Sequence, residues 1–423
     1  MLVTQRDFLR DLFNSAVGAA HPRNCLSDLL PQPPAARLIV LAAGKAAGAM
    51  AQVAEQRYGG GALEGIAVAR HGYGRPLKRI EMIEAGHPVP DEAGLRAASR
   101  IIELANSATK DDIVLVLMSG GASANWIAPA DGVSFADKQA VTRALLRSGA
   151  NIGEINCVRK HLSRIKGGRL ARAAQPARVV TIAISDVPRD DPSAIGSGPT
   201  VPDPTTLADA RAIVERYKLD LPAAVTSALN DAANESPKPG DSAFTNTSFA
   251  LAARPTDALS AAQRKAAAAG YEVIMLGEHL EGEAREVAAA HAKLARDFAA
   301  QGKRAVILSG GELTVTIRGN GRGGPNQEYA LALALALDGT RSIAALAADT
   351  DGTDGGAGSA SDPAGAYADS GTASRARARG LDPAGSLADN NSTGFFAALD
   401  DLLMTGPTFT NVNDFRAIVV DRA

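Results

Sequence analysis

Short apolar runs and longer helical patterns alternate along the chain. In the first half, apolar runs of strand length cover residues 38–42, 113–118 and 179–184, and helical patterns such as residues 46–56 and 92–106 lie between them. Strands that alternate with helices are typical of a parallel sheet with helices on both faces. The first half therefore predicts a Rossmann-like, doubly wound α/β domain.

The alternation resumes after residues 219–241, a stretch rich in Pro, Ala, Asn and Asp that we interpret as a linker. Apolar runs at residues 305–308 and 343–347 belong to a second sheet, which we expect to be mixed. We expect two α/β/α domains, residues 1–235 and 236–423, with a cleft between them. A length of 423 residues agrees, because it exceeds what one hydrophobic core usually holds.

A glycine-rich loop in the second half is the first candidate site. Two apolar runs, residues 305–308 and 313–317, flank Ser309-Gly310-Gly311-Glu312, which is the spacing of a β-hairpin closed by a glycine turn. The glycine-rich loop follows and leads into a helical pattern that begins at Pro325. Bare backbone beside a guanidinium, at the amino end of a helix, can bind an anion. The candidates are Arg322, Gly323, Gly324 and Asn326.

The same loop matches the dinucleotide fingerprint G-x-G-x-x-G at Gly319, Gly321 and Gly324. We do not favour that assignment, because the fingerprint opens the first βαβ unit of a parallel sheet. This loop instead follows the second arm of the expected hairpin, and it carries Arg322. A phosphate or carboxylate site fits better, and a flexible surface loop is the alternative.

Two loops of the first half also follow predicted strands. Lys45 stands at the start of a helical pattern directly after the run at residues 38–42, where open α/β sheets bind ligands. The loop is not a Walker A motif, since Ala46 stands where that motif has Ser or Thr. A solvated lysine is the alternative. The run at residues 113–118 ends in donors for an anion, namely Ser119, Gly120, Gly121 and Ser123.

Residues 151–173 carry seven basic side chains, among them Arg159 and Lys160. The whole chain has 44 basic and 46 acidic residues, so this local excess suggests a site that attracts an anionic substrate. The alternative is a solvated helix face.

Acidic loops follow two other predicted strands. Asp186 comes after the run at residues 179–184, where a carboxylate can hold Mg2+ or accept a hydroxyl proton. A second acidic loop follows the run at residues 343–347, and we expect its acids to converge on one Mg2+. These acids are Asp349, Asp351 and Asp354, and their spacing excludes an EF-hand. Turn chemistry is the alternative in both loops.

The balanced charge and the 4% aromatic content argue against nucleic-acid binding and against anionic lipid surfaces. Cys25 and Cys157 are too few for a disulfide framework, which favours a reducing compartment. The first residues lack the apolar core of a signal peptide, and no apolar run reaches the ~18 residues of a membrane span. We expect a cytoplasmic protein without membrane or nucleic-acid partners.

In their order along the chain, these features resemble the class II glycerate 2-kinases, a family with a glycerate kinase N-terminal domain and a MOFRL C-terminal domain. The resemblance spans nearly the whole chain. It rests on Ala43-Gly44-Lys45, Gly86-His87-Pro88-Val89-Pro90-Asp91, Ser119-Gly120-Gly121, Val158-Arg159-Lys160-His161-Leu162-Ser163, Ser185-Asp186-Val187, Ser197-Gly198-Pro199-Thr200, Gly323-Gly324-Pro325-Asn326-Gln327-Glu328, Asp349-Thr350-Asp351-Gly352-Thr353-Asp354-Gly355 and Thr405-Gly406-Pro407. The chain departs from the family at Ala122, where a third glycine is frequent, at Arg189, where Gly is frequent, and at Gly196, where Ala is frequent.

The resemblance implies Mg2+-dependent transfer of the γ-phosphoryl group of ATP to the 2-hydroxyl of D-glycerate. Under this hypothesis Lys45 and Arg322 bind the phosphate and the glycerate carboxylate, and Asp186 is the base or orients the metal. Ser119, Gly120, Gly121 and Ser123 hold an anion, with Arg159 and Lys160 as further anion-binding candidates. The candidates for Mg2+ are Asp349, Asp351, Asp354 and Glu328.

Two rival functions stay open. The first is an NAD(P)H-dependent hydroxypyruvate reductase, a name that some members of this family carry. The second is a sensor that binds a small organic acid without turnover. The oligomeric state is equally open, with a monomer or a homodimer as the candidates.

Overall fold

The computed structural model describes residues 3–356 and 358–422, which form two compact units. One unit is Leu26–Ala252, and the other combines Met1–Cys25 with Ala253–Ala423. This division differs from the boundary expected near residue 235. The strand β6 (Thr247–Ala253) belongs to the sheet of the first unit, so the residues after 235 extend that unit.

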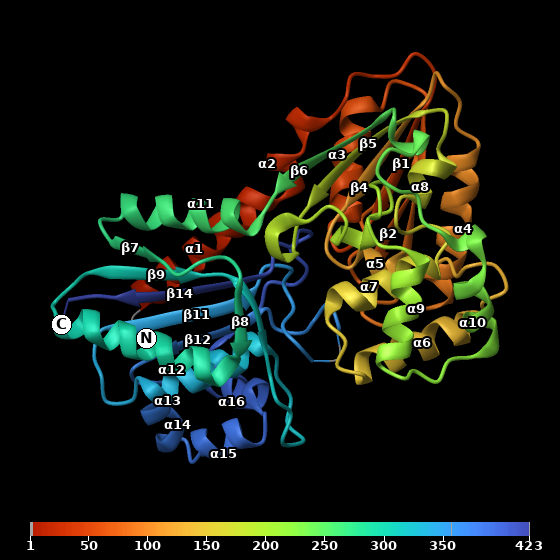
Figure 1. Ribbon diagram of the computed structural model, residues 1–423. Helices are drawn as coiled ribbons and strands as arrows, with labels where there is room; N and C mark the ends of the chain where they lie inside the picture. Colours follow the sequence, from red (N-terminus) through yellow and green to blue (C-terminus); the bar gives the residue numbers. More distant parts are fainter. Residues whose placement is uncertain (1–2, 357, 423) are drawn as a thin grey trace. The chain divides into compact units, whose positions relative to one another are not determined.

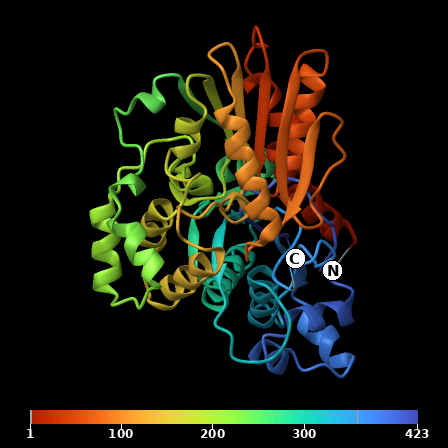
Figure 2. The ribbon, with the colours of Figure 1, turned by 90° about the vertical axis from the view of Figure 1, so that its right-hand side faces the viewer.

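The unit Leu26–Ala252 is built on a six-stranded sheet with the strand order β3-β2-β1-β4-β5-β6. The pairs β1–β2, β2–β3, β1–β4 and β4–β5 are parallel, and Figure 2 shows the red and orange strands β1 to β3 side by side. The strands are β1 (Leu38–Ala43), β2 (Leu63–Arg70), β3 (Ile80–Ala85), β4 (Ile113–Met118), β5 (Arg178–Ile184) and β6. The predicted doubly wound parallel sheet is thus confirmed.

Helices surround this sheet and form the rest of the unit. They are α3 (Ala47–Tyr58), α4 (Glu92–Asn106), α5 (Ala122–Asn125), α6 (Phe135–Arg147), α7 (Ile152–His161), α8 (Arg169–Ala173), α9 (Leu207–Arg216) and α10 (Ala223–Asn230). Short 3-10 helices cover Ser27–Leu29, Pro188–Asp190, Ile195–Ser197, Ala232–Asn234 and Ser242–Phe244. Ile39 and Leu41 of β1 pack in one core with Ala97 and Ile101 of α4. This burial fixes the sheet and therefore the loops at its edges.

The order of the strands creates a switch point in this sheet. The chain runs outward from β1 to β2 and β3, and then returns to place β4 on the other side of β1. The connections after β1 and β4 therefore leave in opposite directions, and open α/β sheets bind ligands beside the carboxyl ends of such strands. Lys45 follows β1, and Ser119 follows β4.

The second unit contains a mixed sheet, as expected, with the order β13-β12-β11-β14-β9-β7. The pair β7–β9 is parallel, and the pairs β9–β14, β14–β11, β11–β12 and β12–β13 are antiparallel. The strands are β7 (Glu272–Met275), β9 (Ala305–Ser309), β11 (Ile343–Asp349), β12 (Gly365–Asp369), β13 (Leu402–Leu403) and β14 (Asp414–Val420). A separate parallel pair joins β8 (Leu280–Glu283) to β10 (Gly311–Thr314).

The helices of this unit include one from the start of the chain. They are α1 (Val3–Ala20), α2 (Pro22–Cys25), α11 (Pro255–Ala268), α12 (Ala284–Ala300), α13 (Pro325–Ala336), α14 (Thr372–Ala378), α15 (Pro383–Ala388) and α16 (Ser392–Leu399). Helix α13 is buried from Asn326 to Ala334, which its apolar residues from Tyr329 to Ala334 explain, whereas the three residues before them are polar. Figure 1 shows the red helix α1 beside the green helix α11. No helix in the described part of the chain is long and apolar enough to cross a membrane.

The expected hairpin around Ser309-Gly310-Gly311-Glu312 is wrong. Strand β9 lies in the six-stranded sheet, whereas β10 pairs with β8 in the separate two-stranded sheet. Gly311 has a φ of +95°, and a Cβ there would clash with the backbone of Leu280. The glycine therefore redirects the chain onto β8 instead of folding it back onto β9.

Candidate functional site

The loops after β1 and β4 are joined directly at the switch point. The N–H of Lys45 donates to the carbonyl of Gly120 at 2.8 Å, and the N–H of Ala46 donates to Ser119 Oγ at 2.9 Å. Gly44, with a φ of +108°, is needed for this approach, because a Cβ there would clash with Ser119. The structure thus brings together two segments that the sequence analysis singled out independently.

The donors predicted for an anion in this loop differ in availability. The Ser119 hydroxyl is buried and engaged with Ala46, so it fastens the two loops together. The N–H groups of Gly120 and Gly121 donate to no partner within residues 3–356 and 358–422. Buried N–H groups are rarely left without an acceptor. Gly120 is buried, so its N–H is a plausible donor to an anionic ligand on physical grounds.

Ser123, on α5, takes part in a second junction with two other segments. Its hydroxyl lies 2.8 Å from Ser197 Oγ and 3.0 Å from Lys166 Nζ. Lys166 Nζ also donates to the Ser123 carbonyl at 2.7 Å. Ser197 is buried and has a φ of 64°, and Lys166 is only 3% exposed. Lys166 is another of the seven basic residues within 151–173, and its position in the sequence indicates no role of its own.

Lys166 lies in a positive environment. Its ammonium pairs with no carboxylate in the described part of the chain. Burial lowers the pKa of Lys166 to about 7, and the charge of Arg159 contributes to the change. Burial also lowers the pKa of Arg159, a predicted anion-binding residue that is half-buried on α7. Buried cations that lack acid partners are costly unless an anion joins them.

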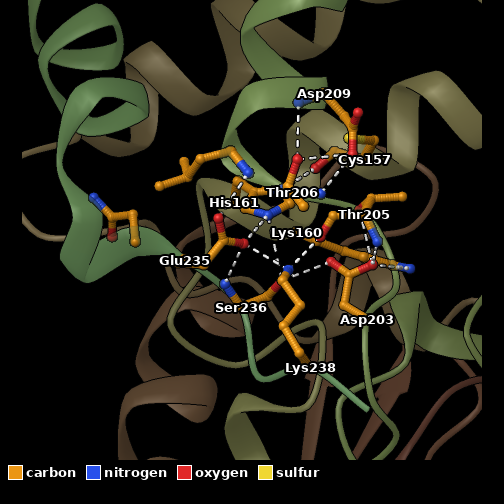
Figure 3. Close-up of polar contacts among 12 residues, drawn as sticks. Cys157, Lys160, His161, Asp203, Thr205, Thr206, Asp209, Glu235, Ser236 and Lys238 are labelled. Carbon is orange, nitrogen blue, oxygen red and sulfur yellow. Dashed lines mark hydrogen bonds and ion pairs between the residues drawn. The ribbon is translucent and has the colours of Figure 1, made fainter.

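Lys160, the neighbouring predicted residue, has a buried acid as its partner. Figure 3 shows its ammonium among the side chains around Asp203, and Lys160 Nζ lies 3.4 Å from Asp203 Oδ1. Ser236 Oγ donates to Asp203 Oδ2 at 2.9 Å and lies 3.3 Å from His161 Nε2. Burial raises the pKa of Asp203, but the charge of Lys160 and the hydrogen bonds from Thr205 and Ser236 together lower it below its usual range. These contacts favour a structural role for Lys160, and phosphate binding there stays a prediction.

Asp186 follows β5 at the same edge of the sheet. Because β4 and β5 are parallel, with Met118 opposite Ala183, the residues after both strands leave at one edge. Asp186 is half-buried there. Its role as base or metal-orienting residue stays a prediction.

The loop after Asp186 contains a non-glycine residue in the left-handed region. Arg189 is exposed and has φ 61° and ψ 12°. A side chain in this region costs roughly 1–2 kcal/mol, and glycine adopts it freely. The position coincides with one where the family that the chain resembles frequently has Gly.

We therefore expect Arg189→Gly to raise the free energy of unfolding by about 0.5–1 kcal/mol, because the relief of strain exceeds the added entropy of the unfolded chain. Urea unfolding monitored by circular dichroism would measure the change. Arg189→Ala is the matched control, since it removes the same side chain but keeps a Cβ, and it should leave stability nearly unchanged. Equal stabilisation by Ala and Gly would contradict the backbone explanation.

In the second unit, the glycine-rich loop packs against the segment before α16. The Gly321 N–H donates to the Asp389 carbonyl at 2.9 Å, and the Arg322 carbonyl accepts from Thr393 N–H at 2.9 Å. A Cβ on Gly321 would clash with Asn391. The glycines are thus explained in part by close backbone packing, and the alternative of a loop without fixed contacts is not supported.

The side chain of Arg322 extends from this anchored loop. It is 67% exposed, and its Nη2 lies 3.5 Å from Asp362 Oδ1. An exposed ion pair at this distance contributes little to stability. The guanidinium is therefore accessible to a ligand, while its backbone is held.

Asp354 caps helix α13. Its two carboxylate oxygens accept from the N–H groups of Asn326, at 3.0 Å, and Gln327, at 2.8 Å. Burial raises the pKa of Asp354 to about 6, and the hydrogen bonds from Asn326 oppose the rise. Asn326 Nδ2 also donates to Asp414 Oδ1 at 2.7 Å. The polar groups of Asp354 and Asn326 therefore serve the start of this helix.

Glu328 also has partners within the unit. Its Oε1 accepts from Arg285 Nε at 2.6 Å and from Asn390 Nδ2 at 3.1 Å. Asn390 Oδ1 in turn accepts from the N–H groups of Arg318 and Gly319, at 2.7 and 3.0 Å. Glu328 thus helps to hold the glycine-rich loop.

The expected convergence of acids on one metal ion is not formed. Within residues 3–356 and 358–422, no group of three or more His, Cys, Asp or Glu side chains is placed to hold a metal. Asp349 Oδ1 accepts from Asp351 N–H at 2.9 Å, and Asp351 Oδ1 accepts from Thr353 N–H at 2.7 Å. These are turn contacts. Mg2+ commonly takes only one or two carboxylates, with phosphate and water as further ligands. Asp349 and Asp351 therefore stay candidates.

Two family models match the chain. The domain of unknown function DUF4147 matches residues 8–230, and the MOFRL family matches residues 305–414. A protein of Agrobacterium vitis, provisionally named a hydroxypyruvate reductase, is 47% identical over 99% of this chain and 95% of its own length. The D-glycerate 2-kinase of Thermotoga maritima is 37% identical over 96% of this chain and 95% of its own length.

A solved structure has the same fold. The crystal structure of glycerate kinase from Thermotoga maritima superimposes with a TM-score of 0.88, with 36% sequence identity and 99% of both chains covered. The resemblance stated from the motifs is thereby confirmed. The chain belongs to the glycerate kinase family that combines a DUF4147 domain with a MOFRL domain.

Proposed function

We propose that this protein is an ATP-dependent glycerate 2-kinase. It transfers the γ-phosphoryl group of ATP to the 2-hydroxyl of D-glycerate and produces 2-phosphoglycerate and ADP. The observation that carries the proposal is the junction at the switch point, where Lys45 and the free N–H groups of Gly120 and Gly121 are held by direct contacts between two loops. The kinase names of relatives across the whole chain support the same reaction.

Phosphoryl transfer needs few protein groups, because catalysis consists mainly of positioning and of neutralising negative charge. Lys45 and Arg322 supply the positive charges for the phosphate and for the glycerate carboxylate. Gly120 and Gly121 donate N–H groups to an anionic oxygen. Asp186 acts as the base or orients the metal.

Mg2+ is the proposed metal, and it would neutralise charge on the phosphates of ATP when bound. Asp349 and Asp351 lie in a single loop, and in each of them a backbone N–H donates to Oδ1, whereas both oxygens of Asp354 accept backbone N–H groups. Asp354 and Glu328 fit less well, because N–H groups and Arg285 already occupy their oxygens.

A hydroxypyruvate reductase is the alternative, and its support is the name that relatives carry. A hairpin no longer speaks against the G-x-G-x-x-G match, since β9 and β10 do not pair. The packing of the glycines speaks against it instead. The fingerprint needs room for a pyrophosphate beside its glycines, whereas Gly319 and Gly321 pack on Asp389 and Asn391. The kinase proposal is therefore preferred.

Two assays on one preparation test the proposal. ADP release is measured with D-glycerate, ATP and Mg2+, and NADH or NADPH oxidation is measured with hydroxypyruvate. We expect turnover only in the first assay, abolished by EDTA and restored by Mg2+. Turnover only in the second would replace the kinase by the reductase. Binding of glycerate without turnover in either assay would favour the sensor.

We also propose a cytoplasmic location and small-molecule substrates alone as ligands, without nucleic acid or membrane. The balanced charge and the two separate cysteines support this. Monomer and homodimer remain the candidate assemblies, and light scattering of the purified chain distinguishes them.

A further inference from the structure

A lysine and two serines from three different segments meet beyond the end of β4, and the proposed function gives no role to the lysine or to Ser197. Ser123 comes from α5, Ser197 from the 3-10 turn at Ile195–Ser197, and Lys166 from the segment between α7 and α8. Their polar atoms form a continuous chain, with 3.0 Å from Lys166 Nζ to Ser123 Oγ and 2.8 Å from Ser123 Oγ to Ser197 Oγ.

The three segments are fixed in this position. Lys166 Nζ is held by the Ser123 carbonyl at 2.7 Å, and the next residue, Gly167, donates its N–H to the Ser197 carbonyl at 3.0 Å. The N–H of Gly168 likewise donates to the Gly198 carbonyl at 2.7 Å. The lysine and both serines are therefore positioned by these contacts, which is what proton transfer along short hydrogen bonds requires.

We propose that Lys166, acting through Ser123, takes up the proton of the substrate hydroxyl during phosphoryl transfer. The inference rests on the proposed kinase activity, and it leaves Asp186 the metal-orienting alternative of its two proposed roles. Ser123 is half-buried, whereas Lys166 and Ser197 are buried, so Ser123 is the most exposed of the three. Ser123 also lies two residues after Gly121, one of the proposed donors to the transferred phosphoryl group.

The proton and the electrons balance as follows. The substrate hydroxyl oxygen forms a bond to the γ-phosphorus, and the bond from that phosphorus to the bridging oxygen of ADP breaks. The hydroxyl proton moves to Ser123 Oγ while the Ser123 proton moves to the neutral amine of Lys166. The resulting ammonium loses its proton to solvent before the next turnover.

The surroundings of Lys166 suit this cycle. Arg159 on α7 is a positive group whose charge lowers the pKa of Lys166. Lys138 on α6 is a further basic group nearby, and the charge of Lys166 lowers its pKa in turn. No carboxylate pairs with the ammonium in the part of the chain that the structure describes. Burial, aided by the charge of Arg159, lowers the pKa of Lys166 to about 7, so a large fraction is neutral at physiological pH.

Lys138 offers a matched control. It is a second buried lysine, and its Nζ donates only to the carbonyls of Arg159, at 2.9 Å, and Leu162, at 2.8 Å. It therefore holds the carboxyl end of α7 and has no link to a side-chain hydroxyl. Loss of Lys138 therefore tests what removal of a buried lysine near Lys166 does when the link between Lys166 and Ser123 is kept.

The test is the pH dependence of kcat/KM for D-glycerate between pH 5.5 and 9.5, measured for the full chain. In the wild type, kcat/KM should rise about tenfold per pH unit below pH 7 and level off above it. Lys166→Met, Lys166→Arg and Ser123→Ala should lose about 100-fold or more at pH 8 and lose this rise. Lys138→Met should keep the rise. Lys166→Ala with added ethylamine should regain activity.

Each other outcome is decisive. A Lys166 variant with the wild-type rise and rate would overturn the relay but leave the kinase intact, whereas a wild type without glycerate turnover would remove the kinase itself. If the Lys166 variants fail to fold, as thermal unfolding would reveal, Ser123→Ala decides, because it retains the lysine and removes only the relay hydroxyl. A wild-type pH profile in Ser123→Ala overturns the relay.

Discussion

Replacing Lys45 by alanine should lower kcat/KM for D-glycerate about 10²- to 10³-fold, because a positioned charge on the transferring phosphoryl group is lost. The fold should survive, since the contacts that join this loop to the next are made by the backbone N–H groups of Lys45 and Ala46. Steady-state kinetics with saturating Mg2+ and ATP would measure the change.

Lys110→Ala is the matched control for this variant. Lys110 is exposed and precedes β4, so it lies at the opposite edge of the same sheet from Lys45. Its loss should change kcat/KM less than twofold. If Lys45→Ala and Lys110→Ala were equally active, Lys45 would have no part in catalysis and the switch-point site would lose its cation.

The second large effect is expected at Arg322. Arg322→Ala should lower kcat/KM about 10²-fold or more, because an exposed guanidinium on an anchored backbone binds a charged oxygen of a substrate. Arg318→Ala, in the same loop and also exposed, is the control and should retain nearly full activity. The ratio of kcat/KM for Arg318→Ala to kcat/KM for Arg322→Ala distinguishes a specific contact of Arg322 from a general effect of charge on the loop. Similar losses in both variants would contradict a specific role for Arg322.

Much of the first unit could be predicted from the sequence, because its strands are continuous apolar runs. The runs that end before Lys45, Ser119 and Asp186 became β1, β4 and β5, and parallel pairing brings their carboxyl ends to one edge. A position at a strand end depends only on local pattern and sheet topology, and both can be inferred from residue order.

Contacts between distant segments could not be predicted in this way. Lys160 lies 43 residues from Asp203, and Asp354 lies 28 residues from the Asn326 N–H that it accepts. Periodicity indicates that such residues lie on a helix or in a loop, but it does not identify the side chain of a distant segment that contacts them. Lys160 and Asp354 were therefore predicted to bind ligands, although their contacts with Asp203 and Asn326 inside the protein explain their presence at least as well.

The hairpin prediction was wrong, and the boundary near residue 235 differs from the division into two units, for a related reason. Strand β8, which receives β10, has the sequence Leu-Glu-Gly-Glu, without the apolar alternation that marks a strand. Strand β6 lies beyond a proline-rich stretch that has the composition of a linker but stays within the first unit. Tertiary pairing overrides local composition in both cases.

The position of helix α1 at the start of the chain affects how the protein folds during synthesis. Its Leu9, Leu12 and Phe13 are buried, and Phe8 stacks on Tyr271 with ring centroids 5.1 Å apart. Its main partner α11 begins only at Pro255, so at about 5–20 residues per second the ribosome takes on the order of tens of seconds to supply it. During that interval the nascent helix keeps its apolar side uncovered, and we expect chaperones to bind there until the later segment emerges.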